Sequence, residues 1–409
     1  MANNIAEVFS LQGLYVHTIT TTDATITIAA KGRRRTAECT KCGTRSHRIH
    51  QYHYRTVNHG QLNDKVILVQ LTVRRFLCKR CNKPFTESLS GINRRLSSNH
   101  CMQHQLEDAA TMSIKSTAKK HDVAWASVAG LLDAIHYEID WSKQGKRISL
   151  GLDEHSLRKR RQMVTTITNL TRGKRNLLTI LPNDKKETIV KFLETVPKEA
   201  RTRVTEICID MRSSFRSAIE EAWSDVNIVA DPFHVVQLAG KKLEEVRSVV
   251  LGNLGRETPR VKRALLTPKE KLKQEDQAKL TALWATTKPW PNLKIAWVVK
   301  EKIRDVYKSR SRESAEKKFQ LLLAYLEDVD SKPLKTLRKT LIEWQEQILN
   351  HFDHGTSNGF TEGCHTKIKM LKRQSYGFRN RERYKMKILL GFHSVSELLG
   401  TTVRTDYAN

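Results

Sequence analysis

Residues 148–155 read ISLGLDEH, a short apolar segment that ends in two acids, Asp153 and Glu154. Its apolar residues alternate, which is typical of a β-strand. The segment therefore predicts a strand whose end exposes a carboxylate, and Asp153 is a candidate metal ligand.

The same design recurs at residues 204–210, which read VTEICID and precede a predicted helix. Two strand-end carboxylates, Asp153 and Asp210, can converge on one cation, because Mg²⁺ prefers oxygen ligands. Acids at strand ends are also often helix caps, so each residue alone has a second interpretation.

The segments around these acids alternate between strand-like and helical, which predicts an α/β region. The predicted strands cover 148–152, 163–170, 177–181, 204–209 and 226–230, and the predicted helices cover 185–195 and 214–223. Residues 240–350 instead contain amphipathic helical segments and no convincing strand. Residues up to about 90 alternate in the manner of short strands, as at 66–73.

A third acid, Glu362, begins a segment with helical spacing, EGCHTKIKMLKR. One side of this helix would carry Cys364, Ile368 and Leu371, and the other would carry Glu362, Thr366, Lys369 and Arg373. Three carboxylates held close together repel one another unless cations offset them. Two Mg²⁺ or Mn²⁺ ions at Asp153, Asp210 and Glu362 would offset that charge, activate a water or a 3′-hydroxyl, and stabilise the leaving oxygen.

Two CxxC pairs, Cys39 with Cys42 and Cys78 with Cys81, are separated by strand-like sequence. Four thiolates can close a tetrahedral structural zinc site, and the long separation requires an extended hairpin between the pairs. The alternatives are four unrelated buried cysteines or a redox pair. Disulfides are not expected, because the seven cysteines are an odd number and no export signal is evident. The basic residues of this ribbon suit phosphate contact, and they are Arg74, Arg75, Lys79 and Arg80.

Residues 116–135 predict a helix, a tight break at His121 and Asp122, and a second helix. This is the spacing of a helix-turn-helix, in which Trp125, Ser127 and Val128 would face the bases. Any pair of packed helices can show a similar pattern.

Charge indicates the partner. The 409 residues include 72 Lys and Arg against 43 Asp and Glu, so the formal net charge is +29. Such an excess favours a polyanion, and DNA in particular; a merely soluble basic protein is the alternative. No apolar segment reaches the roughly 18 residues of a membrane-spanning helix, and the first residues lack a basic signal-peptide start. We therefore expect a cytoplasmic protein with no membrane partner.

Several short motifs occur in a characteristic order after the cysteine pairs and the helix-turn-helix. They are Gly151-Leu-Asp153-Glu, Asp210, Asp231-Pro-Phe-His234-Val, Ser357-Asn-Gly-Phe-Thr-Glu362-Gly and Tyr376-Gly-Phe-Arg379-Asn380. In this order the chain resembles the bacterial insertion-sequence transposases of the ISL3 group over nearly its whole length. The resemblance implies a ribonuclease-H-like catalytic domain interrupted by a helical insertion.

The resemblance also implies roles for single residues. Asp153, Asp210 and Glu362 match the DDE triad, with Asp231 a rival for the second place. Asp210 is preferred because it ends a longer predicted strand, the fourth in order, where ribonuclease-H-like enzymes carry that acid. Asp231 and His234 then resemble an accessory Asp-x-x-His pair, although His234 is also compatible with a core histidine.

Other residues near Glu362 have less specific roles. The family commonly has Asn where this chain has His365. The candidates for contact with the scissile phosphate or the DNA backbone are Asn358, Lys367, Lys369 and Arg373. A solvated basic helix face is the competing interpretation for this group.

The expected architecture is multidomain α+β. It comprises a zinc-ribbon DNA-binding domain (1–92), a helix-turn-helix (93–142), the first part of a ribonuclease-H-like core (143–238), an α-helical insertion (239–352), and the last part of the core with Glu362 (353–409). We expect a transposase that binds its terminal inverted repeats and target DNA, at least as a dimer. The rivals are a DNA-binding regulator and a ribonuclease-H-like nuclease without strand transfer.

Overall fold

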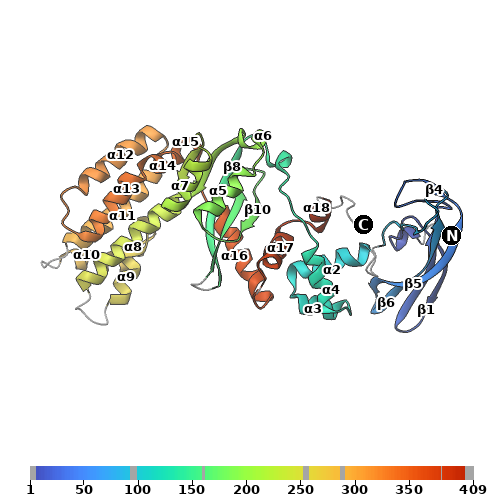
Figure 1. The fold of residues 1–409 in the computed structure, drawn as a ribbon. Helices are drawn as coiled ribbons and strands as arrows, with labels where there is room; N and C mark the ends of the chain where they lie inside the picture. The colour runs from blue at the N-terminus through green and yellow to red at the C-terminus, as the bar shows by residue number, and fades with distance from the viewer. Residues whose placement is uncertain are drawn as a thin grey trace. The chain divides into compact units, whose positions relative to one another are not determined.

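The computed structural model describes residues 6–92, 99–158, 162–251, 258–285, 291–378 and 380–400 (Figure 1). Arg379 of the sequence motifs lies outside the described residues. The chain divides into two compact units, one formed by Met1–Glu138 with Ile368–Asn409 and the other by Ile139–Lys367. Each unit has a hydrophobic core of its own.

The first unit contains a five-stranded sheet in the order β1-β2-β6-β5, with β7 paired to β6. Its strands are β1 (Leu14–Thr21), β2 (Thr25–Gly32), β5 (Ile49–Leu62), β6 (Lys65–Leu77) and β7 (Pro84–Thr86). Apolar residues alternate along β2 and β6 and fill the core beneath the sheet. The predicted strands and the extended hairpin between the cysteine pairs are confirmed, because β5 and β6 pair antiparallel from Ile49↔Phe76 to Leu62↔Lys65.

The same unit contains a helical bundle. Its members are α2 (Asn99–Thr111), α3 (Ile114–Lys120), α4 (Trp125–Asp133), α17 (Arg381–Phe392) and α18 (Val395–Gly400). The predicted break between two helices is confirmed at Asp122, which has a φ of 48°. The prediction that Val128 faces DNA bases is wrong, because its side chain is fully buried against Ala109 and Ala118.

The second unit is built on a sheet in the order β10-β9-β8-β11-β12. Its strands are β8 (Ile148–Arg158), β9 (Gln162–Asn169), β10 (Asn176–Leu181), β11 (Val204–Ile209) and β12 (Asn227–Ala230). The strands β8, β9 and β10 are antiparallel neighbours, whereas β11 runs parallel to both β8 and β12. The connecting helices are α5 (Lys186–Glu194), α6 (Lys198–Arg201) and α7 (Ser213–Ala222). The predicted alternation of strands and helices is therefore confirmed.

A helical block follows β12. Its helices are α8 (Pro232–Leu251), α9 (Thr258–Leu266), α10 (Gln274–Ala285), α11 (Pro291–Tyr307), α12 (Arg312–Tyr325), α13 (Lys332–Glu343), α14 (Gln345–Leu349) and α15 (His351–His354). Two short 3₁₀ turns, Trp141–Gln144 and Lys269–Lys271, and a last helix, α16 (Gly359–Gln374), complete the described elements of this part of the chain.

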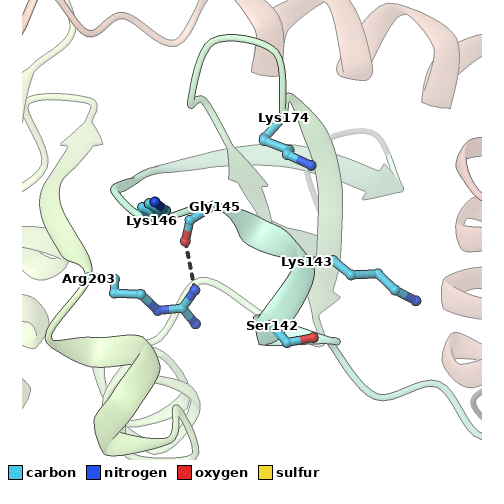
Figure 2. Close-up of a pocket in the computed structure, with 6 residues that line it drawn as sticks. All are labelled: Ser142, Lys143, Gly145, Lys146, Lys174 and Arg203. Carbon is cyan, nitrogen blue, oxygen red and sulfur yellow. Dashed lines mark hydrogen bonds between the residues drawn. The ribbon is translucent and has the colours of Figure 1, made fainter.

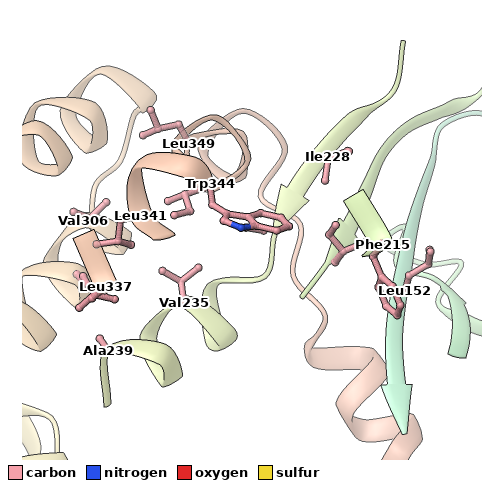
Figure 3. Packing of buried hydrophobic residues seen from close by; sticks show 14 of the residues in the cluster. Leu152, Phe215, Ile228, Val235, Ala239, Val306, Leu337, Leu341, Trp344 and Leu349 are labelled. Atoms are coloured by element: carbon pink, nitrogen blue, oxygen red, sulfur yellow. The ribbon is translucent and has the colours of Figure 1, made fainter. Parts of the chain in front are cut away.

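One continuous core joins the helical block to the sheet. The Trp344 ring lies between Val235 of α8 and the sheet-side residues Phe215 and Ile228 (Figure 3). All four side chains are nearly or fully buried. Burial of large apolar side chains is the main stabilising contribution to such a core. The helical block therefore stabilises the sheet through a shared core.

No helix in the described ranges is both long enough and apolar enough to cross a bilayer.

Candidate active site

Three acids occupy equivalent positions along three neighbouring parallel strands. Asp210 and Asp231 directly follow β11 and β12, whereas Asp153 lies within β8, which continues to Arg158. The prediction that Asp153 ends its strand and is exposed there is wrong, because β9 pairs with β8 beyond this position and Asp153 is buried. The register pairs Leu152 with Ile209, and Ile209 with Ala230. The next residue on each strand is an acid, so Asp153, Asp210 and Asp231 meet at one edge of the sheet. Carboxyl ends of parallel strands are where α/β sheets commonly place ligand-binding residues.

Burial and mutual repulsion disfavour the ionised form of these acids when no cation is bound. Asp153 is 4 % exposed. Its burial, and then the charges of Asp210, Asp231 and Glu362, raise the pKa of Asp153 to about 7, although His234 opposes this. Burial also raises the pKa of Asp231. A group of acids that resists ionisation in this way is suited to a divalent cation, which would favour the charged carboxylates.

His234, from the first turn of α8, is the nearest base. Its Nδ1 lies 2.9 Å from an Asp210 carboxylate oxygen. Burial alone would lower the pKa of His234, but the hydrogen bond to Asp210 and the charges of Asp153 and Asp231 raise it overall. One ligand atom from each of Asp153, Asp210 and His234 lies within 4.8 Å of the others, which is close enough for one metal ion.

Asp231 has a different environment from Asp210. One of its carboxylate oxygens accepts a hydrogen bond of 2.9 Å from the backbone N–H of Asn358. The other oxygen is buried and accepts no hydrogen bond from the described residues. Asp231 is 1 % exposed, whereas the Asp210 side chain retains 15 % exposure. Asp210 is therefore the more accessible of the two candidates for the second acid.

Asn358 fixes the start of α16, which carries Glu362 in its first turn. Its side-chain amide donates to the backbone carbonyls of Leu152 and Cys208, at 3.2 and 3.4 Å. These carbonyls belong to β8 and β11, so one amide spans the two strands that position Asp153 and Asp210. Asn358 is fully buried, and this position excludes it from a DNA-facing surface.

His365, one turn after Glu362, also reaches the acids. Its Nδ1 lies 3.6 Å from an Asp153 carboxylate oxygen, and its Nε2 lies 3.0 Å from the Thr166 hydroxyl. That hydroxyl also lies 2.8 Å from Nδ1 of His155. The sequence pattern indicated only that His365 departs from the family, and its place beside Asp153 depends on how α16 docks on the sheet.

The four paired cysteines converge in the first unit. The sulfurs of Cys39, Cys42, Cys78 and Cys81 all lie within 4.8 Å of one another. Two tight turns shape the cluster: the Cys39 N–H donates to the Thr44 carbonyl, and the Cys78 N–H donates to the Lys83 carbonyl. A four-sulfur group of this kind can hold one tetrahedral ion, and zinc is the ion that such sites commonly bind.

The predicted DNA contacts of the ribbon differ in accessibility. Lys79 and Arg80 are exposed, and Arg75 is half-buried. Arg74 is buried, and its guanidinium donates to both carboxylate oxygens of Glu87 and to the carbonyls of Gly32 and Arg34. Arg74 therefore has a structural role in the ribbon.

The other predicted contacts lie on helices. Trp125 and Ser127 are exposed on α4, and Lys367, Lys369 and Arg373 are exposed on α16. Sequence reasoning did not include Arg383 of α17, whose guanidinium lies over the Trp125 ring at 5.2 Å and pairs with Asp133 at 2.6 Å. Its only sequence signal was a basic residue near the Tyr376–Asn380 motif.

Comparison with known proteins gives the family. A family model for DDE transposases of the ISL3 group, described as "Transposase", matches residues 150–388. A transposase for insertion sequence element IS1001 from Bordetella parapertussis is 24 % identical over 380 residues, which cover 90 % of this chain and 92 % of the relative. A transposase for insertion sequence element IS1557 from Mycobacterium tuberculosis is 24 % identical over 299 residues, or 63 % of each chain.

The matched region begins in β8 and ends in α17, so it contains Asp153, Asp210, Asp231 and Glu362. The chain belongs to the ISL3 family of DDE transposases, as the resemblance of its motifs predicted. It is thus a member of a family of DNA-processing enzymes of insertion sequences.

Proposed function

We propose that this protein is a transposase that binds the terminal inverted repeats of its element, cleaves the DNA and transfers the strands with two divalent metal ions. The observation that supports this best is the meeting of Asp153 and Asp210 at one sheet edge, with Glu362 close enough to raise the pKa of Asp153. A DNA-binding regulator has no need of such an acid group.

The second unit would supply a ribonuclease-H-like core. Its first three strands are antiparallel neighbours, and β11, the fourth in chain order, runs parallel to β8 and is followed directly by Asp210. This is the position at which the family resemblance places the second acid. We retain the division into ribbon, helix-turn-helix, two-part core and helical insertion as part of the proposal.

The metal ions would be Mg²⁺ or Mn²⁺, held by Asp153, Asp210 and Glu362. When bound, such a pair supplies an activated water or 3′-hydroxyl and stabilises the leaving oxygen of the phosphodiester. The protein's own residues would do the positioning. Asn358 sets α16 against the two strands, and His234 holds the Asp210 carboxylate in place. Asp231 would act on the site through Asn358 and His234.

The first unit would recognise the element's ends. A zinc ion at the four cysteines would brace the end of the β5–β6 hairpin, where Lys79 and Arg80 are exposed. Trp125 and Ser127 of α4 would contact the bases. Self-association as a dimer or a larger assembly would bring two ends together.

The decisive experiment is cleavage of supercoiled DNA that carries the element's ends, with Mg²⁺ present. We expect Asp153→Asn, Asp210→Asn and Glu362→Gln each to lower the cleavage rate by about 100-fold or more, because each removes charge that acts on the transition state. DNA binding should persist in all three. Asp328→Asn, which alters an exposed acid of the helical block, is the matched control.

Asp231→Asn separates the two candidates for the second acid. Inactive Asp231→Asn beside active Asp210→Asn would transfer that role to Asp231. Normal cleavage by all four site variants would overturn the enzymatic proposal. A protein that binds the ends but cuts nothing with either Mg²⁺ or Mn²⁺ would be a regulator instead.

A further inference from the structure

A basic cavity lies beside the starts of β8 and β11, the end of these strands away from the acids. Figure 2 shows the residues that line it. Its volume is about 480 Å³, and it is lined by Ser142, Lys143, Gly145, Lys146, Lys174 and Arg203. Three segments of the second unit form it: the residues before β8, the turn between β9 and β10, and the residue before β11.

The strand register shows why these segments meet. Ile148 pairs with Val204 at the start of the parallel strands, and the end of β9, Asn169, pairs with Leu150. Ile148 also donates its N–H to the Arg203 carbonyl at 2.7 Å. The pairing of β8 with β9 and β11 therefore forms the cavity, at the end of the sheet where β8 and β11 begin.

The cationic groups of the cavity are incompletely neutralised. Arg203 donates to the carbonyls of Trp141, Gly145 and Glu199 at 2.8, 2.6 and 3.0 Å. None of the carboxylates in the described part of the chain forms an ion pair with it. Lys143 pairs with Asp140 at 3.0 Å. Lys146 and Lys174 are exposed and form no ion pair with any of the described residues. No acid lines the cavity, so a bound anion would be stabilised by several positive charges at once.

The surrounding surface continues the positive charge. Arg147, Arg172 and Arg175 are exposed on the same segments as Lys146 and Lys174. The two segments are joined by a hydrogen bond from the Thr171 hydroxyl to the Arg147 carbonyl, at 3.3 Å. A single small anion would use only part of this surface, whereas a polyanion would use all of it.

Distance separates the cavity from the reacting phosphodiester. Asp153 lies five residue steps after Ile148 along β8, which corresponds to about 17 Å along the strand. That is roughly half of one turn of duplex DNA. The phosphate at the acids therefore cannot be the phosphate in the cavity.

We propose that this cavity binds a backbone phosphate of double-stranded DNA at a point away from the bond that is cut. The inference rests on the proposed function, because that function makes DNA the partner. Arg203 supplies a positioned charge at the base of the cavity, and Lys146 and Lys174 close on the phosphate from two sides. Phosphates carry no sequence information, so the contact should strengthen binding to every duplex equally.

The test measures binding of the zinc-loaded full chain to duplex DNA over a range of salt concentrations, without Mg²⁺. Lys146→Ala with Lys174→Ala should weaken binding to terminal-repeat and unrelated duplexes alike. It should also reduce the slope of log K against log salt by about 0.9, since one phosphate contact contributes about that much. Lys191→Ala with Lys339→Ala, which removes two exposed lysines elsewhere in this unit, should leave the slope unchanged.

A third pair of variants keeps the positive charge at both positions while it changes the shape of the side chains. Lys146→Arg with Lys174→Arg should retain the wild-type slope, because arginine also binds phosphate. An alanine pair that matches the control pair, or an arginine pair that loses as much as the alanine pair, would overturn the proposal. The readout needs no cleavage, so failure of the acid variants to stop cutting would refute the proposed function and leave this result standing.

Discussion

At the scale of single residues, the site depends on the close packing of side chains against the backbone of β8 as well as on charge. Gly151 belongs to β8, the strand that contains Asp153. A Cβ atom on this residue would lie 2.6 Å from both Asn358 Oδ1 and Thr168 Oγ1, and all three residues are buried. The glycine therefore lets Asn358 reach across β8, and through Asn358 it influences the position of Glu362.

We expect Gly151→Ala to destabilise the protein by about 1–3 kcal/mol, the usual cost of overpacking a core. Cleavage should also fall, because the displaced Asn358 no longer sets α16. Thermal unfolding and the cleavage assay measure the two effects. Gly363→Ala is the control for stability, since an added Cβ there meets nothing within 4 Å. Equal stability of the two variants would contradict this account.

At the scale of elements, short polar contacts attach the last helices to what precedes them. The Thr356 hydroxyl donates to the buried Glu206 at 2.7 Å and so anchors the segment before α16 to β11. In the first unit, α17 packs on α2 and α4. Its Lys387 is 1 % exposed and donates to the carbonyls of Ala109 and Met112 at the end of α2.

This buried lysine predicts a pH dependence. Burial lowers the pKa of Lys387 from 10.5 to about 8. The unfolded chain then binds more protons than the native one between pH 8 and 10.5, so the lysine's contribution to stability rises with pH in that window. We expect wild type to gain on the order of 2 kcal/mol relative to Lys387→Met between pH 8 and pH 10.

Denaturant unfolding at the two pH values measures this difference. Lys385→Met removes a lysine from a partly exposed position of the same helix and controls for the loss of charge. A stability difference between wild type and Lys387→Met that stays constant or shrinks as pH rises would show that burial does not govern this lysine.

At the scale of the whole molecule, each of the two units has its own main core and, among the described residues, its own candidate metal site. The cysteine cluster packs with Phe76 and Phe85 in a small local core of the first unit. The acid group lies on a sheet supported by the continuous core of the second unit. Loss of one metal should therefore affect one unit first.

We expect Cys42→Ser to abolish zinc binding and to lower the unfolding temperature of the first unit alone, because structural zinc contributes on the order of 10 kcal/mol to folding. DNA binding should fall with it. Calorimetry should show the transition of the second unit unmoved, and a zinc-release assay should show the missing ion. Cys101→Ser, a buried cysteine outside the cluster, is the control. A shift of both transitions together would refute independent units.

Much of this protein was determined by the sequence alone. Apolar segments were enough for the existence of the strands β8 to β12, although β8 continues to Arg158 where the sequence predicted an end at residue 152. The spacing of the cysteines was enough for an extended hairpin, and the motif order was enough for the family. These features are local, since they depend on periodicity, turn chemistry and spacing within short segments. Only the tertiary structure decided which of the predicted site residues are accessible. Arg74 is paired with Glu87, Asn358 is enclosed between β8 and β11, Val128 is in a core, and His365 lies beside Asp153. Burial depends on contacts with residues far away in the chain, and a local sequence pattern does not specify those contacts.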